Sequence, residues 1–158
     1  MSLAINSRRA GFRAESTVIQ LVDELRPVPD SEHQHHDAIT TTLLTPSRQL
    51  PFGSIPLLER GTVVEIKSAA VVITEQQRKG RFLIRESQHE HLLSEAGSYL
   101  FAVASPDPDR ELLAMKIVPA SIVDELLGTW IERESRARYC QITWSAIFAV
   151  DEIRGDQR

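Results

Sequence analysis

The sequence predicts an α/β fold: a single domain with a mixed central β-sheet flanked by helices. Segments rich in β-branched residues are interleaved with segments of helical periodicity, but not in strict strand–helix–strand alternation. The length of 158 residues suits one domain with its own hydrophobic core. A content of 42% hydrophobic and 25% charged residues is ordinary for a globular protein and excludes a mostly disordered chain.

A helix and a strand are the first predicted elements. Residues 14–25 carry one apolar stripe at helical spacing, formed by Val18, Leu21, Val22 and Leu25. The prolines that follow predict the end of this helix. Residues 38–44 are rich in Thr and Ile and predict a strand, and the prolines of residues 46–56 indicate a loop.

The most apolar part of the chain comes next. Residues 61–74 predict the central strand, with a polar turn after it, and residues 81–86 alternate as a further strand. Residues 87–97 predict a helix, with Ser87 as its N-cap and Gly97 closing its C-terminal end.

The last third of the chain predicts three strands and one short helix. The strands cover residues 98–104, 112–118 and 139–144. The helix covers residues 119–127 and has Pro119 in its first turn. The mixed charges of residues 130–139 indicate a surface loop.

Composition restricts the class of protein. No apolar run approaches the ~18–20 residues that a membrane span needs. The first residues lack the apolar core of a signal peptide, so we expect a cytoplasmic protein that does not associate with membranes. The single cysteine, Cys140, cannot form an internal disulfide, and we expect it to be a buried apolar side chain. A net charge of −4 disfavours broad, non-specific nucleic-acid affinity but leaves room for a local basic groove.

Glu65 and Lys67 stand two residues apart in the central predicted strand. Because successive side chains of a strand point to opposite faces, we expect these two to project together. Val64 and Ile66 then pack on the other face. Burying two charges is costly unless they are paired or bind something, so this pair needs a reason. On the tripeptide alone, an ion pair on a half-exposed sheet face is the favoured interpretation over a functional site, since short Glu-x-Lys matches arise by chance.

Two further carboxylates strengthen the functional interpretation. Asp37 stands at the start of the preceding predicted strand, and Glu15 in the first turn of the leading helix. Three carboxylates and one lysine suit a divalent-metal phosphodiesterase site, because Mg²⁺ prefers carboxylate and water oxygens. A lysine there would orient the attacking water and offset charge that develops on the phosphate.

The ordered set of these pieces resembles the PD-(D/E)XK nuclease superfamily. It is similar in particular to archaeal Holliday-junction resolvases and uncharacterised haloarchaeal relatives. The matching pieces are GFRAE at 11–15, HHDA at 35–38, VEIKS at 64–68, GRFLIRESQHEHLL at 80–93 and YLFAV at 99–103. The resemblance covers about residues 8–104 and implies a restriction-endonuclease-like αβββαβ core. Residues 105–158 would then be a C-terminal elaboration of the same domain.

The resemblance also implies a metal site and its ligands. Asp37 and Glu65 resemble the two metal-binding carboxylates of the superfamily, with the backbone carbonyl of Ile66 as an extra ligand. Glu15 is similar to the helix glutamate that holds metal-bound water in many members. The implied cofactor is Mg²⁺ or Mn²⁺.

Two other residues match positions that act on the substrate. Lys67 resembles the catalytic lysine, and Gln88 the supporting glutamine that many members place near the phosphate.

The chain departs from the pattern of the superfamily in two places. The separation between Asp37 and Glu65 is longer than the tight hairpin of many members, and His36 replaces the motif proline.

Basic residues before the 87–97 helix are candidates for DNA contacts, because arginine forks match phosphate oxygens. The expected rim consists of Arg78, Lys79, Arg81 and Arg85, with Arg13 added from the leading segment. A solvated strand edge is the alternative interpretation. His89 and His91 are expected to be ordinary surface polar residues.

These observations give a metal-dependent DNA endonuclease as the first hypothesis, with branched or junction DNA as a candidate substrate. Because nucleases of this type often cut two strands as dimers, we also expect a homodimer. The alternative is a catalytically inactive nuclease fold that serves as a nucleic-acid-binding or assembly module. A zinc-binding regulatory domain built on His33, His35, His36 and Asp37 is a third hypothesis.

Overall fold

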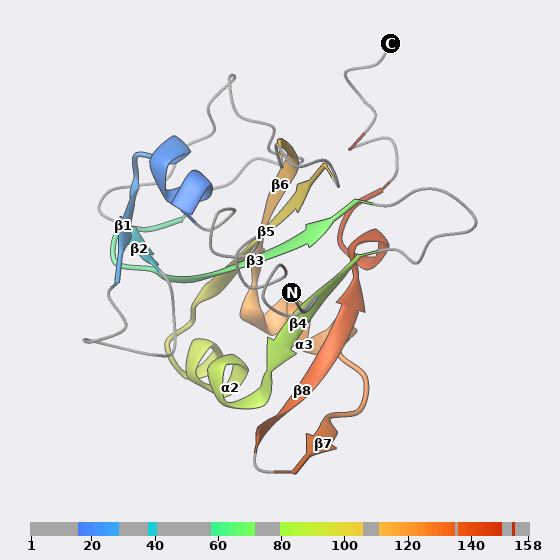
Figure 1. Cartoon of the computed structure of the whole chain (residues 1–158). Helices are drawn as coiled ribbons and strands as arrows, with labels where there is room; N and C mark the ends of the chain where they lie inside the picture. The colour runs from blue at the N-terminus through green and yellow to red at the C-terminus, as the bar shows by residue number, and fades with distance from the viewer. Residues whose placement is uncertain are drawn as a thin grey trace.

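Two β-sheets form the framework of the protein (Figure 1). This computed structural model describes residues 16–28, 38–40, 58–71, 80–105, 111–134, 136–149 and 153. The larger sheet has the order β1-β2-β3-β5-β6, and the smaller has the order β4-β8-β7. The larger sheet consists of β1 (Leu25–Pro27), β2 (Ala38–Thr40), β3 (Val63–Ala70), β5 (Ser98–Ala104) and β6 (Leu112–Pro119). The smaller consists of β4 (Arg81–Arg85), β7 (Ile131–Arg133) and β8 (Arg136–Thr143).

The helices are short and lie against these sheets. They comprise a helix over residues 16–21, α2 (Glu86–Ser94), α3 (Ala120–Leu126) and the 3₁₀ turn η1 (Trp144–Ala146). None of the described helices is long and apolar enough to cross a bilayer.

The larger sheet is mixed, as predicted. The pair β3–β5 is parallel, whereas β1–β2, β2–β3 and β5–β6 are antiparallel. A parallel pair needs a crossover connection, and here the crossover passes through β4 and α2. The start of α2 is thereby brought back beside β3, which is the geometric basis of the candidate site.

Alternation along β3 sends its side chains into two separate apolar cores. Val64 and Ile66 pack with Val18 and Val22 of the first helix. Val63 packs on the opposite face, in the core that also contains α2, α3 and the smaller sheet. Glu65 and Lys67 have the parity of Val63, so both project into the layer that contains α2, as the period of the strand predicts.

The helix expected over residues 14–25 is shorter at its C-terminal end. It ends at Leu21, and Leu25 instead begins β1, where it pairs with Thr40 of β2. Leu21, which the stripe places in the core, is 45% exposed. Pairing at the sheet edge therefore overrides the local helical pattern.

The smaller sheet holds the strand predicted over residues 81–86. Phe82 and Ile84 of β4 are fully buried, while Arg81 and Arg85 are exposed on its other face. β4 pairs with β8, which includes much of the stretch expected to be a loop. That expectation was wrong because the hairpin of β7 and β8 is stabilised by pairing with the distant β4, which mixed charges do not reveal.

The two ends of α2 differ from the expected caps. Arg85, not Ser87, is the N-cap residue, and Ser87 lies inside the helix. At the other end the amides of Ala96 and Gly97 donate to the carbonyls of Leu93 and Leu92, which is the Schellman pattern. Ala96 adopts the left-handed conformation with φ of 51°. Gly97 is needed for a different reason, because a Cβ there would lie 2.6 Å from Cγ2 of Val63.

Candidate active site

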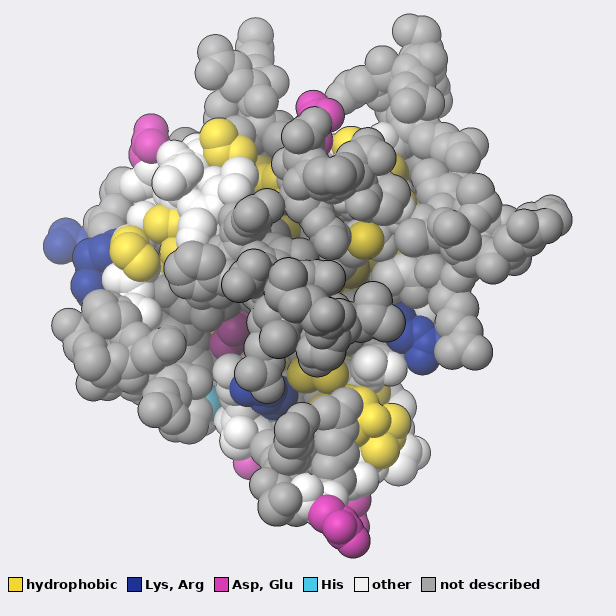
Figure 2. Space-filling view, in the orientation of Figure 1, with side chains coloured by type: hydrophobic (Ala, Val, Ile, Leu, Met, Phe, Trp, Pro, Cys, Tyr) yellow, Lys and Arg dark blue, Asp and Glu magenta, His cyan; other side chains and the backbone are white. Residues whose placement is uncertain are grey.

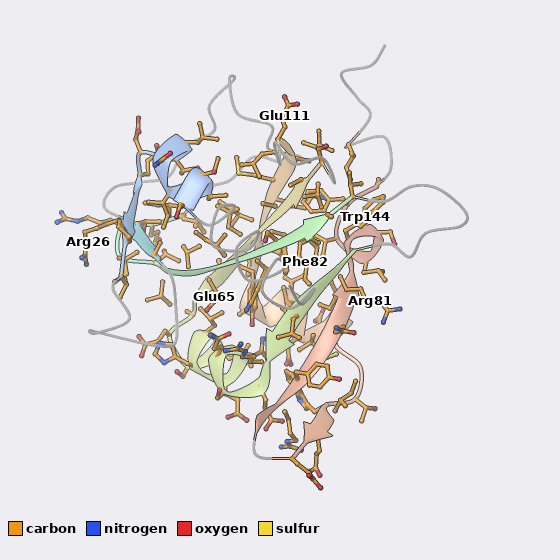
Figure 3. All side chains as sticks on the ribbon, viewed as in Figure 1. Arg26, Glu65, Arg81, Phe82, Glu111 and Trp144 are labelled. Atoms are coloured by element: carbon orange, nitrogen blue, oxygen red, sulfur yellow. The ribbon has the colours of Figure 1, made fainter. Side chains whose placement is uncertain are left out.

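The candidate site lies on β3, on the face that α2 covers. Glu65 is 3% exposed, although it carries a carboxylate, and the residues on either side of it in β3, Val64 and Ile66, are apolar and buried. Figure 3 shows its side chain on the side of β3 that faces α2. The neighbouring strand β5 places Tyr99 opposite Glu65 and Phe101 opposite Lys67. Both aromatic residues are fully buried, so they wall the site on one side.

Lys67 connects β3 to α2. Its Nζ donates a hydrogen bond to Oε1 of Gln88 at 3.2 Å and lies 3.8 Å from Oε1 of Glu65. The side chains of Lys67 and Glu65 are 14% and 4% exposed. Three of the residues selected from the sequence therefore meet at one place. Five of the other residues that the hypothesis uses lie outside the described residues: Glu15, Asp37, Arg13, Arg78 and Lys79.

The electrostatics of this place centre on the Glu65 carboxylate. A buried carboxylate is stable only when opposite charge or hydrogen-bond donors compensate for lost solvation, and the Lys67 ammonium supplies such a charge. Burial raises the pKa of Tyr99 well above its ordinary value, and the negative charges of Glu65 and Asp124 raise it further. Tyr99 therefore stays a neutral phenol beside the carboxylate.

The donor chemistry of the site fits a hard divalent cation. Glu65 offers carboxylate oxygens, and the side chain of Ile66 points into the opposite core, so only its backbone carbonyl could contribute. Within the described part of the chain, no three His, Cys, Asp or Glu side chains cluster as a metal site. The thiol of Cys140 is buried in β8, in the smaller sheet. An oxygen-only donor set suits Mg²⁺ or Mn²⁺ better than zinc.

Comparison with known proteins identifies the family of the chain. A family model described as the PD-(D/E)XK nuclease superfamily domain matches residues 1–149. The chain belongs to the PD-(D/E)XK nuclease superfamily. No curated protein and no solved structure gives a significant match. Membership of the PD-(D/E)XK superfamily indicates a nuclease that acts on nucleic acid. The matched range also includes β6, β7 and β8, which lie beyond the resemblance at residues 8–104.

Basic residues of this PD-(D/E)XK domain are dispersed over its described surface. Arg81 and Arg85 are exposed on β4, and Arg85 directly precedes α2. Arg81 also lies 3.4 Å from Oε1 of Gln141. Figure 3 places Arg26 and Arg81 on opposite sides of the molecule, and Figure 2 shows basic side chains at separated places on this face. Two of the expected DNA-contacting residues are thus available to solvent, and one of them, Arg85, lies at the start of α2.

His89 was wrongly expected at the surface. It is 1% exposed, and both of its ring nitrogens have hydrogen-bond partners, Tyr99 and Asp124. A signal in the sequence could have found it, because His89 and Leu92 are spaced i, i+3 and share one helix face. They are the buried residues of α2.

Proposed function

We propose that the protein is a divalent-metal-dependent DNA endonuclease that hydrolyses phosphodiester bonds. The observation that carries this proposal is the position of Lys67. Its ammonium lies between the carboxylate of Glu65 and the amide of Gln88, and its side chain is largely buried. A structural ion pair accounts for the contact with Glu65, but it gives no reason for the contact with Gln88 on a separate element.

In this proposal Glu65 holds Mg²⁺ or Mn²⁺ together with Asp37, Glu15 and the carbonyl of Ile66. When bound, the metal would polarise the scissile phosphate and lower the pKa of a water molecule. Asp37 directly precedes Ala38, and Ala38 pairs with Val64, the neighbour of Glu65. That register supports the assignment of Asp37 as a second carboxylate ligand.

Lys67 acts on the substrate. An ammonium donates three hydrogen bonds, so Lys67 can keep its contact with Gln88 while it orients the attacking water and a phosphate oxygen. Negative charge grows on the phosphate in the transition state, and a pre-positioned cation in a poorly solvated layer stabilises that charge strongly. Gln88 holds the ammonium in place.

The substrate we propose is DNA, with branched or junction structures the first to test, and the active form we propose is a homodimer. Arg81 and Arg85 would contact phosphates beside the start of α2, together with Arg78, Lys79 and Arg13. The exposure of Arg81 and Arg85 supports their part in this rim.

The proposal is tested by cleavage assays on four-way junctions, flaps and linear duplexes with Mg²⁺, Mn²⁺ or EDTA. The parent chain should cut at least one of these substrates, only when metal is present. Lys67→Ala should abolish cleavage while DNA binding and the folded state persist, because its assigned role belongs to the transition state. Glu65→Gln should also abolish cleavage, because it removes a proposed metal ligand. Lys116→Met is the matched control, since Lys116 is half-buried in β6 and donates to the carbonyl of Ile147.

Two outcomes would decide against the proposal. Equal cleavage rates for the parent chain and Lys67→Ala would show that the assigned mechanism is wrong. DNA binding without cleavage of any substrate by the parent chain would favour the inactive, nucleic-acid-binding alternative.

A further inference from the structure

The imidazole of His89 links α2, which carries Gln88 of the candidate site, to β5 and α3. His89 lies on α2, its Nδ1 is 2.9 Å from the hydroxyl of Tyr99 on β5, and its Nε2 is 2.8 Å from Oδ1 of Asp124 on α3. The ring also stacks on Tyr99 at a centroid distance of 5.9 Å and lies 6.0 Å from the ring of Trp130. Contacts on two edges and two neighbouring rings hold the imidazole in one orientation.

Hydrogen-bond chemistry assigns the protons along this chain of contacts. The Asp124 carboxylate has no proton to donate, so Nε2 of His89 must donate to it. In the neutral imidazole Nδ1 is then the acceptor, and the hydroxyl of Tyr99 donates to it. The network therefore fixes one tautomer of a buried ring.

His89 is also one of the two buried residues of α2. Among the nine residues of this helix, His89 and Leu92 are the buried ones, and no side chain caps its N-terminus. An aliphatic side chain would fill the same space without two buried ring nitrogens, each of which is costly when left unpaired. The polar contacts of His89 thus fix the rotation and position of α2 in a way that apolar packing alone does not.

Gln88 precedes His89 in the helix and points to a different neighbour. Successive helical residues are about 100° apart around the axis, so His89 faces β5 and α3 while Gln88 faces Lys67. We propose that Asp124, His89 and Tyr99 form a positioning array that holds Gln88 against Lys67. This inference rests on the proposed nuclease function for its effect on catalysis. The hydrogen bond between Lys67 and Gln88 is present without substrate, so the effect of the array on it can be measured without any catalytic activity.

The first test needs no catalytic activity. The chain has three lysines, Lys67, Lys79 and Lys116, so selective ¹⁵N labelling of lysine Nζ gives few signals to assign. Gln88→Ala should identify the Lys67 signal by shifting it. Tyr99→Phe and Asp124→Ala, each of which removes one contact of His89, should shift the same signal in the same direction.

Matched variants distinguish a displaced Gln88 from a general destabilisation of α2. Asp124→Asn keeps an acceptor oxygen for Nε2 and should retain the parent signal of Lys67. Leu93→Ala changes a side chain of α2 that is 38% exposed and should also leave the signal unchanged. The Lys116 signal, which reports a hydrogen bond to Ile147, should not move in any of them. A Lys67 signal that is unaltered in Tyr99→Phe and in Asp124→Ala would overturn the proposal.

A double-mutant cycle supplies the catalytic test. Tyr99→Phe alone should lower kcat by about 10–100-fold, the effect expected of a misplaced catalytic group, with little change in KM. In a Gln88→Ala background it should have almost no further effect, because the residue through which it acts is already gone. If Tyr99→Phe lowered kcat equally in the parent chain and in the Gln88→Ala background, the proposal would be overturned. If the parent chain is inactive, the proposed function fails, and the ¹⁵N measurement alone then decides whether the array positions Gln88.

Discussion

Nζ of Lys67 and Oε1 of Gln88 lie 3.2 Å apart and join the middle of β3 to the first turn of α2. The contact joins a strand of the larger sheet to a helix that directly follows β4 of the smaller sheet. A charged donor makes this hydrogen bond stronger than one between neutral groups. The geometry of the candidate site therefore depends on how the crossover between β3 and β5 is held.

Removing the amide of Gln88 should impair catalysis more than stability. We expect Gln88→Ala to lower kcat about 10-fold or more, because Lys67 loses the group that orients it, while the thermal midpoint changes little. Single-turnover cleavage and thermal unfolding measure the two effects. Gln141→Ala is the control, since Gln141 accepts from Arg81 at the surface. Equal kcat losses in both variants would contradict the assigned role.

Two substitutions at the C-terminal end of α2 should change the free energy of unfolding in opposite directions. Ala96→Gly should stabilise the protein by about 0.5–1 kcal/mol, because the left-handed penalty of about 1–2 kcal/mol exceeds the entropic cost of glycine. Gly97→Ala should destabilise it by about 1–3 kcal/mol, because the added Cβ would lie 2.9 Å from the carbonyl oxygen of Val63, which cannot rotate away. Urea unfolding measures both changes. The same sign of change in the two variants would contradict the cap geometry.

Tyr99 predicts a loss of stability at alkaline pH. Its pKa is raised in the folded state, mainly by burial and further by Glu65 and Asp124, whereas the unfolded chain releases the proton near pH ~10. Above that pH the unfolded state binds fewer protons than the folded state, so the free energy of unfolding falls as pH rises. In Tyr139→Phe, where Tyr99 is the remaining tyrosine, tyrosinate absorbance should appear together with loss of circular dichroism. Tyrosinate in a folded protein near pH ~10 would contradict the burial.

Charge reversal at Arg81 and Arg85 of β4 tests the proposed DNA-contacting rim. Arg81→Glu combined with Arg85→Glu should weaken DNA binding at every sequence and reduce the salt slope by about one per lost phosphate contact. Fluorescence anisotropy over a salt series measures both quantities. Arg26→Glu combined with Arg60→Glu is the matched control, since these exposed arginines give the same net charge. Equal weakening in both double variants would show that overall charge, and not this rim, controls binding.

The identity of the metal is a separate prediction. Oxygen donors without thiolates should bind Mg²⁺ or Mn²⁺, and zinc affinity should stay modest. Isothermal titration calorimetry of the parent chain and Glu65→Gln measures this, and the variant should lose Mn²⁺ binding. Tight stoichiometric zinc with no effect of Mg²⁺ would instead support the histidine cluster at residues 33–37.

The sequence predicted the strand that carries the site because that prediction depends only on local periodicity. A period of two places Glu65 and Lys67 on one face of β3, and the structure confirms it. Gln88 was selected by resemblance, and the structure places it beside Lys67. The structure does not test the catalytic roles of these residues, which stay predictions.

What the sequence could not predict depends on contacts between distant segments. The pairing of β4 with β8 decides that residues 81–85 join the smaller sheet, and no local pattern encodes it. The burial of His89 depends likewise on Tyr99 and Asp124, which come from two other elements. The early end of the first helix follows from the pairing of Leu25 with Thr40.

The pairing of β4 with β8 has a consequence for synthesis on the ribosome. Arg85, the last residue of β4, pairs with Tyr139, so the strand must wait for a segment made much later. Translation delivers roughly 5–20 residues per second, and a nascent chain that stops before β8 offers β4 no strand to join. In such a chain β4 is unpaired, so the helix α2 that follows it is not held in position and Gln88 is not fixed beside Lys67. A nascent chain that ends before β8 would therefore carry Lys67 and Glu65 without the organised contact between Lys67 and Gln88.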